Sequence, residues 1–153
     1  MSGYNVTTPG LFKVQDPALL VQADIAQLTS QIVTPHTAII DAAGNRTYTT
    51  NEMFSNTIIR KGCTGNVTDK FPTATQIIQA LEQRLTALRG REVVVKAGDY
   101  FPLTVVNQSD YDVDFTTSTG VNGTFNTVPS NEARIGYITV INTSPAKVFV
   151  DSL

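Results

Sequence analysis

The sequence holds one histidine and one cysteine, the side chains that most often act as a catalytic base and a nucleophile. His36 lies in a segment that we expect to be extended, and Cys63 lies between glycines in a turn-rich loop. A serine hydrolase would pair the histidine with a G-x-S-x-G turn, and the sequence contains no such motif. A nucleophilic Cys63 would need a base, and His36 is the one histidine that could serve as that base. We therefore interpret both residues as structural or exposed, and we predict no catalytic residues and no enzymatic activity.

Three alternating carboxylates, Asp110, Asp112 and Asp114, resemble the start of a calcium-binding loop. Such a loop continues with glycine at its sixth position and glutamate at its twelfth, where this sequence has Phe115 and Val121. The same alternation is typical of a strand whose carboxylates face water. The inward positions of that strand would be Tyr111, Val113 and Phe115. One histidine and one cysteine are also too few for a structural zinc site, and we expect neither a metal nor a cofactor.

The charge balance excludes further classes of function. Eleven Lys and Arg against thirteen Asp and Glu give a net charge of -2, whereas a nucleic-acid-binding protein normally carries a basic stripe. The first residues show no signal peptide, and no apolar run approaches the roughly 20 residues of a membrane helix. We expect a protein made in a cytoplasm, with neither nucleic acid nor membrane as a partner.

One helix is predicted clearly, over residues 73–89. Thr73 and Gln76 form a capping box at its start, and Gly90 provides a stop at its end. Its apolar face carries Ile77, Leu81, Leu85 and Leu88.

Strands dominate the rest of the body. Residues 45–50 and 55–60 have strand-like composition, and Thr50 or Asn51 would cap a helical turn between them. After the helix the apolar period changes to two. The strands predicted there are residues 93–95, 101–107, 111–117, 124–128, 134–142 and 146–151. This spacing predicts a mainly β fold: a small antiparallel sandwich with the helix packed on one face or end.

The chain divides into an N-terminal arm, residues 1–45, and a β-rich body, residues 46–153. In the arm, Asp16 and Pro17 favour the start of a short helix. Four apolar residues then share one helical face, namely Val21, Ile25, Leu28 and Ile32. Such a stripe has no core of its own and must dock on the body or on a partner. We predict that these four residues form an interface, either with a partner protein or between copies of the chain, and that the arm is an anchoring segment.

The order of motifs in residues 50–153 resembles one family. The motifs are, in chain order, Ile58-Ile59-Arg60, Phe71-Pro72-Thr73-Ala74, Ile77-Ile78-Gln79-Ala80, Phe101-Pro102-Leu103-Thr104-Val105-Val106-Asn107, Thr119-Gly120-Val121, Ile138-Thr139-Val140-Ile141-Asn142-Thr143-Ser144 and Val148-Phe149-Val150. The set is similar to that of the small β-rich decoration, cement or head-fibre proteins on the capsids of tailed phages and other large double-stranded DNA viruses.

This resemblance implies a non-enzymatic structural protein of the virion, located on the outer surface of an icosahedral capsid. It also implies a homotrimer and the major capsid protein as the partner. An extended arm on each of three subunits would bind the capsid by avidity.

A second reading of the sequence is a binding module. A tail or fibre adhesin domain would hold a host glycan on strands that carry Tyr111 or Tyr137. This alternative requires an exposed tyrosine, whereas the alternation predicts that Tyr111 is buried.

Overall fold

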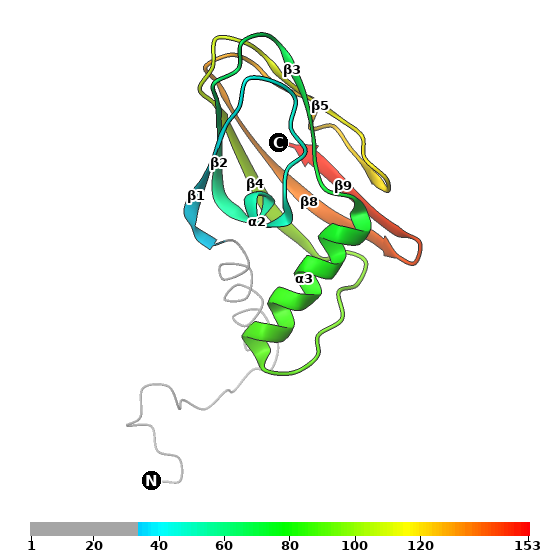
Figure 1. Ribbon diagram of the computed structural model, residues 1–153. Coiled ribbons are helices and arrows are strands. Elements are labelled where there is room, and N and C mark those ends of the chain that lie inside the picture. The colour runs from blue at the N-terminus through cyan, green and yellow to red at the C-terminus, as the bar shows by residue number, and fades with distance from the viewer. Residues whose placement is uncertain (1–33) are drawn as a thin grey trace, which may run out of the picture.

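The fold is shown in Figure 1 as a computed structural model, which describes the backbone from Thr34 and the side chains from Thr37 to Leu153. The short helix predicted in the arm and its stripe, Val21, Ile25, Leu28 and Ile32, lie outside the described residues. The described elements are β1 (Thr34–Asp41), α2 (Thr50–Met53), β2 (Ser55–Lys61), β3 (Val67–Lys70), α3 (Ala74–Arg89), β4 (Tyr100–Asn107), β5 (Val113–Thr116), β6 (Val121–Asn122), β7 (Thr127–Val128), β8 (Ala133–Thr143) and β9 (Ala146–Ser152).

The strands form two sheets, so the predicted mainly β fold with one packed helix is confirmed. The larger sheet has the strand order β1-β2-β4-β8-β9-β6, and the smaller has the order β3-β5-β7. The prediction of purely antiparallel pairing is wrong, because β1–β2, β2–β4, β3–β5 and β6–β9 are parallel pairs. Parallel neighbours need long connections, and the segment carrying β3 and α3 supplies the one between β2 and β4.

The helix α3 begins and ends where the sequence predicts. The Thr73 hydroxyl accepts a hydrogen bond from the Gln76 backbone N–H at 3.3 Å, and the Gln76 side chain accepts one from the Thr73 N–H at 3.0 Å. Gly90 has φ of 69°, in the left-handed region, and ends the helix. Leu81 is fully buried, but Leu88 is 42% exposed. The last turn of α3 therefore extends beyond the core, whereas Leu85 still packs against it.

Two predicted strands are absent from the described structure because local hydrogen bonds take their place. Residues 45–50 contribute a single bridge, Thr47 to Lys70, since Thr49, rather than Thr50 or Asn51, caps α2 in a capping box with Glu52. Residues 93–95 form a loop along α3. There the N–H of Val93 donates to the Thr86 hydroxyl, and the N–H of Val95 donates to the Glu82 carboxylate. Helix side chains satisfy donors that a sheet would otherwise satisfy.

The predicted strand at 111–117 is shorter than expected. β5 begins at Val113, and Tyr111 is 41% exposed rather than buried. The backbone turns before the strand because the carbonyl of Tyr111 accepts hydrogen bonds from Asn107 Nδ2 and Ser109 Oγ. Tyr111 therefore belongs to the turn and not to the strand.

The boundary predicted at residue 45 lies too far along the chain. β1 pairs with β2 along its length, so residues 34–41 belong to the large sheet. The segment that follows is also fixed, because the Arg60 guanidinium donates to the carbonyls of Ala42 and Gly44 at 2.6 Å each. The body thus includes Thr34 and every residue after it.

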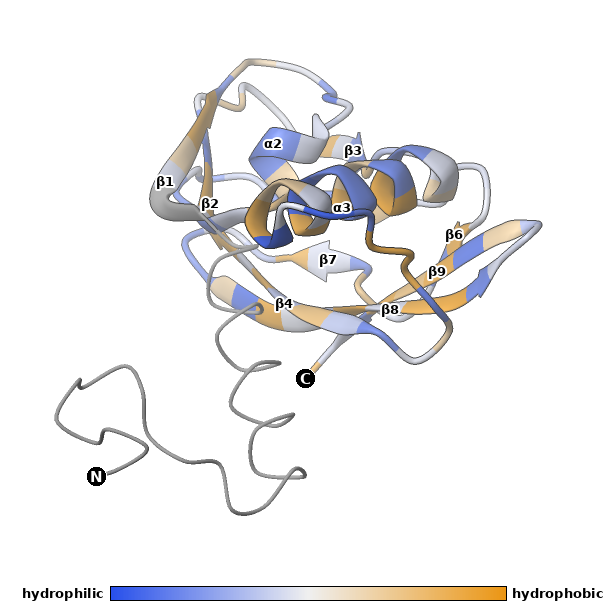
Figure 2. Cartoon of the chain, turned by 90° about the horizontal axis from the view of Figure 1, so that it is seen from below, coloured by the Kyte–Doolittle hydropathy of each residue, from blue (hydrophilic) through white to orange (hydrophobic). Residues whose placement is uncertain are grey.

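The core lies between the two sheets and α3. Its aromatic part includes Tyr48, Phe71, Phe115 and Phe125, with the rings of Phe71 and Phe115 stacked at 4.6 Å. Its aliphatic part includes Ile58, Ile77, Leu81 and Ile138. Figure 2 shows α2, α3 and β7 on the same side of β4 and β8. The large sheet therefore has an inner face that packs on the core and an outer face.

Candidate interaction surface

The outer face of the large sheet carries large apolar side chains that remain exposed. Pleating places alternate residues on opposite faces, and the inner positions of β4 and β8 are buried, as Leu103 and Ile138 show. The outer face is defined here by six exposed residues, Ile39, Tyr100, Ile135, Tyr137, Phe149 and Leu153. Their exposed fractions run from 38% for Tyr137 to 77% for Leu153. In the described part of the chain, no element covers them.

The strand register makes these side chains neighbours. Tyr100 and Phe149 both lie opposite Thr139 of β8, one on each side. The rings of Tyr100 and Tyr137 meet edge to face, with centroids 5.8 Å apart. On the β1 side, half-buried Ile59 lies between Ile39 and Val106. The outer face is thus a continuous apolar surface across five strands.

Charged groups lie within this surface as well as at its margins, since Lys147 and Asp151 alternate with the buried residues of β9 and share the face of Phe149. Asp151 lies opposite Tyr137, and its carboxylate accepts a hydrogen bond from the Thr124 N–H at 3.0 Å. Lys61 and Asp41 pair at 3.5 Å where β1 and β2 end. The other polar groups of the face include the threonines Thr57, Thr104 and Thr139.

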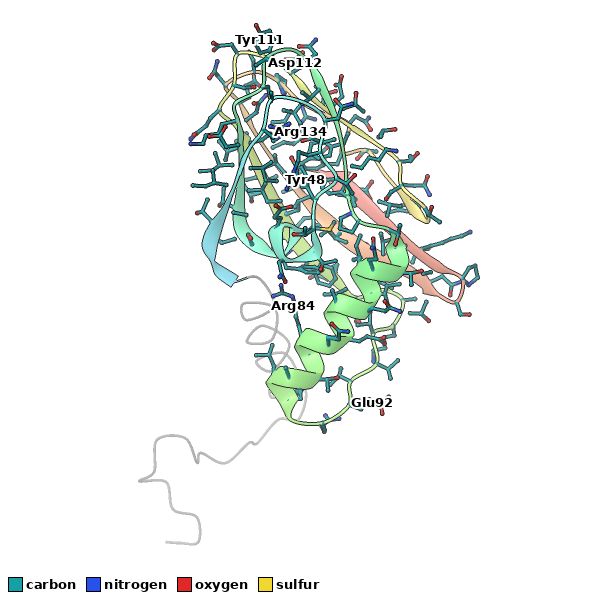
Figure 3. All side chains as sticks on the ribbon, viewed as in Figure 1. Tyr48, Arg84, Glu92, Tyr111, Asp112 and Arg134 are labelled. Carbon is teal, nitrogen blue, oxygen red and sulfur yellow. The ribbon has the colours of Figure 1, made fainter. Side chains whose placement is uncertain are left out.

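A buried ion pair supports the inner side of the large sheet. Arg60 Nε donates to Asp69 Oδ2 at 2.8 Å, and the Tyr48 hydroxyl donates to the same oxygen at 3.0 Å. Both charged side chains are fully buried. Burial lowers the pKa of Arg60, but its hydrogen bond to Asp69 and the charge of Asp69 outweigh burial and raise the pKa overall. Burial also raises the pKa of Tyr48, and Asp69 raises it further. Figure 3 shows Tyr48 in the middle of the molecule, away from its ends. The cluster therefore holds the fold together from within.

Asn107 joins the two sheets in a similar way. Its amide nitrogen donates to the carbonyls of Tyr111, Val128 and Pro129 at 2.7–3.1 Å. Its amide oxygen accepts from the N–H and the hydroxyl of Ser109. Asn107 is itself 1% exposed. The end of β4 is thereby fixed to the segment that follows β7.

The structure does not bring His36 and Cys63 together. Thr37 lies opposite Thr57, and Asp41 lies opposite Lys61 in the parallel register of β1 and β2. The backbone of His36 is therefore at the beginning of this strand pair, whereas half-buried Cys63 follows its other end.

The three alternating carboxylates also have separate partners. Their oxygens accept hydrogen bonds from three different residues: Asp110 from Asn131, Asp112 from Ser130, and Asp114 from Thr127. These bonds hold the segment around β7 against β5. Among the described residues, no group of three or more His, Cys, Asp or Glu is arranged to hold a metal ion.

A small cavity lies behind the aromatic core. Phe71, Phe115, Phe125 and Val150 line it, and its volume is about 30 Å³. That volume accommodates one or two water molecules and is far below the roughly 300 Å³ of a typical small-molecule site.

In the described part of the chain, no helix is long and apolar enough to cross a membrane. No protein-family model, curated protein or solved structure matches the chain.

The outer face was not identified from the sequence, although a signal for it exists. In β8, Ile135 and Tyr137 alternate with Ile138 and Val140, so the strand carries apolar residues on both faces. A strand with one solvated face normally alternates apolar with polar residues. Two-sided hydrophobicity in the β8–β9 hairpin is the sequence feature that indicates the apolar outer face.

Proposed function

We propose that this chain is a non-enzymatic structural protein that decorates or cements the outer surface of an icosahedral viral capsid. The main support is the ordered motif set, because three of its polar residues have defining positions in the fold. Arg60 forms the buried ion pair, Thr73 caps α3, and Asn107 joins the sheets. Motifs that resemble those of decoration proteins are therefore the residues that determine the architecture.

The outer face provides independent support for a structural role. It is broad and mainly apolar, which suits contact with another protein surface. The attachment to the major capsid protein is assigned to the arm, through Val21, Ile25, Leu28 and Ile32. Three arms of one homotrimer would bind together, so that each can be weak alone.

Immunogold electron microscopy tests the capsid role. Antibodies raised against the body, residues 34–153, are applied to particles from the source of the sequence. We expect regularly distributed label on the outside of the capsid. Label confined to the tail or absent from the particles would contradict capsid decoration.

An adhesin domain that binds a host glycan is the second candidate function. The exposed pair Tyr100 and Tyr137 favours it, since aromatic rings stack on sugars. A glycan array with the full chain would give a signal that Tyr137→Ala abolishes, whereas Tyr111→Ala, at a different surface, would leave it unchanged. An array without signal would argue against this candidate.

A further inference from the structure

Two apolar features of this chain each need a surface that covers them. One is the outer face, whose six defining residues expose an area on the order of 600 Å². Soluble monomers rarely expose a contiguous apolar patch of more than a few hundred Å². The other is the stripe of the arm, which has no core of its own and consists of Val21, Ile25, Leu28 and Ile32.

The stripe ends at the edge of the sheet that carries the outer face. Its last residue, Ile32, precedes Thr34 by two positions, and Thr34 begins the edge strand β1 opposite Ser55. The parallel register of β2 and β4, continued back along both strands, places Ser55 level with Pro102. The partner of Pro102 on β8 is Tyr137. The arm therefore joins the sheet in the row of residues that contains Tyr137.

The stripe is also long enough to cross this face. Even at 1.5 Å per residue, the rise of a helix, the twelve residues from Val21 to Ile32 extend about 17 Å. The strands β1, β2, β4, β8 and β9 span about 19 Å at their usual spacing. One residue, Val33, links the stripe to β1, so the stripe is held at a high effective concentration beside the face. Docking within one chain therefore costs less entropy than the capture of a separate partner.

We propose that in the free protein the arm folds back and its stripe covers the outer face of the same chain. The segment 21–32 carries one charged residue, Asp24, so its docking removes little charge from water. Strand β9 contributes one charge of each sign to the outer face, Lys147 and Asp151, so the strand has no net charge that would repel Asp24.

This contact is an autoinhibitory cover. Any partner that binds the stripe must first displace it from the outer face, so attachment of the arm is a competition between two sites for the same four residues. The outer face is then exposed only where the arm has found its partner. The cover concerns the free protein and does not rest on the capsid role.

Tryptophan fluorescence of the full chain tests the cover, because the sequence contains no tryptophan. Leu28→Trp places a single reporter in the stripe, and we expect the emission of a buried indole and weak quenching by acrylamide. Adding Tyr137→Lys should raise the quenching constant at least about threefold, since the contact cannot bury an unpaired ammonium group. The matched control is Tyr111→Lys, because Tyr111 and Tyr137 are 41% and 38% exposed. Figure 3 shows Tyr111 at the end of the molecule opposite Glu92, and this variant should leave the reporter buried.

A second pair keeps the test decisive if Tyr137→Lys does not fold by circular dichroism. Ile135→Lys should expose the reporter, and Val94→Lys, at an exposed residue after α3, should not. A reporter that is exposed to water without any change in the outer face would overturn the cover. So would a buried reporter that Tyr137→Lys or Ile135→Lys leaves unchanged, or an equal response to the control variants.

A dilution series separates docking within one chain from docking between subunits. We expect the burial of the reporter to be independent of protein concentration. Burial that is lost on dilution would place the stripe on another subunit and would also overturn the cover. Because no particles are needed, this result is separate from that of the capsid labelling.

Discussion

At the scale of single residues, the fold depends on buried polar groups whose partners lie far along the chain. The sequence indicates Arg60 through its motif but not its partner Asp69, since nothing in the local sequence marks a carboxylate as buried. Asn107 was predicted to end a strand at a turn, and it does. Two of its three carbonyl partners, Val128 and Pro129, come from a segment that approaches Asn107 only after folding. Local chemistry is predictable from sequence, whereas the pairing of distant polar residues is not.

Removing the charge of Asp69 should destabilise the protein strongly. Asp69→Asn leaves the buried Arg60 guanidinium without its countercharge, which typically costs about 3–5 kcal/mol. The matched control is Asp41→Asn, because the Asp41–Lys61 pair is exposed and worth less than about 1 kcal/mol. Urea denaturation gives both free energies of unfolding. Equal values for the two variants would show that the buried pair lacks the role assigned to it.

Tyr48 should make the protein less stable at high pH. Burial raises its pKa above the ordinary 10.0, so the unfolded chain loses this proton first. The stabilisation is fully present below pH 10 and declines as the pH rises towards the folded-state pKa, by about 1.4 kcal/mol per pH unit. We expect the wild type to lose stability between about pH 10 and 11 more steeply than Tyr48→Phe. Urea titrations across this range check the slopes, and parallel slopes would contradict a buried, protonated phenol.

At the scale of elements, α3 is the best-predicted part of the chain because its signals are local. The capping box, the apolar face and the terminal glycine lie within eighteen residues, Thr73 to Gly90. The extent of its burial was less predictable, since Leu88 lies past the edge of the core. Residues 93–95 show the opposite case. Their β-branched side chains favour a strand. Their backbone N–H groups, however, donate hydrogen bonds to the side chains of Thr86 and Glu82 and are therefore not available to pair in a sheet.

Two leucines of α3 should respond differently to truncation. Leu81→Ala opens a cavity in the core and should cost about 2–5 kcal/mol of stability. Leu88→Ala removes a 42% exposed side chain from the same helix and should cost less than about 1 kcal/mol. Thermal and urea unfolding measure both. Similar losses for the two variants would mean that the core extends to the end of α3.

At the scale of the whole molecule, the order and direction in which the strands pair differ from the prediction more than the content of strands and helix does. Consecutive strands were expected to form hairpins, and β8–β9 does so. β2 instead pairs with β1 and β4 in parallel, because α2 and α3 lie in the connections between them. The hydrophobic period indicates that a segment is a strand but not which strand it joins. For the same reason the predicted boundary at residue 45 is misplaced: the sequence does not show that β1 pairs with β2, so this strand was assigned to the arm.

Two truncated chains should separate the arm from the body. A chain of residues 34–153 keeps β1 and the carbonyls of Ala42 and Gly44, so it should fold and stay soluble. A chain of residues 46–153 exposes the edge of β2 and leaves Arg60 without those acceptors. We expect it to aggregate or to melt well below the longer one, by circular dichroism and light scattering. Equal melting temperatures would show that β1 is dispensable.

Capsid decoration is tested most directly by reconstitution. Purified particles that lack the protein are incubated with the full chain or with residues 34–153, and bound protein is located by electron microscopy. We expect the full chain to add regular density to the outer capsid surface, and the truncated chain to lose most of this binding because it lacks Val21, Ile25, Leu28 and Ile32. Equal occupancy by both chains would place the anchor in the body. Particles that bind no full chain on the capsid would contradict a decoration protein.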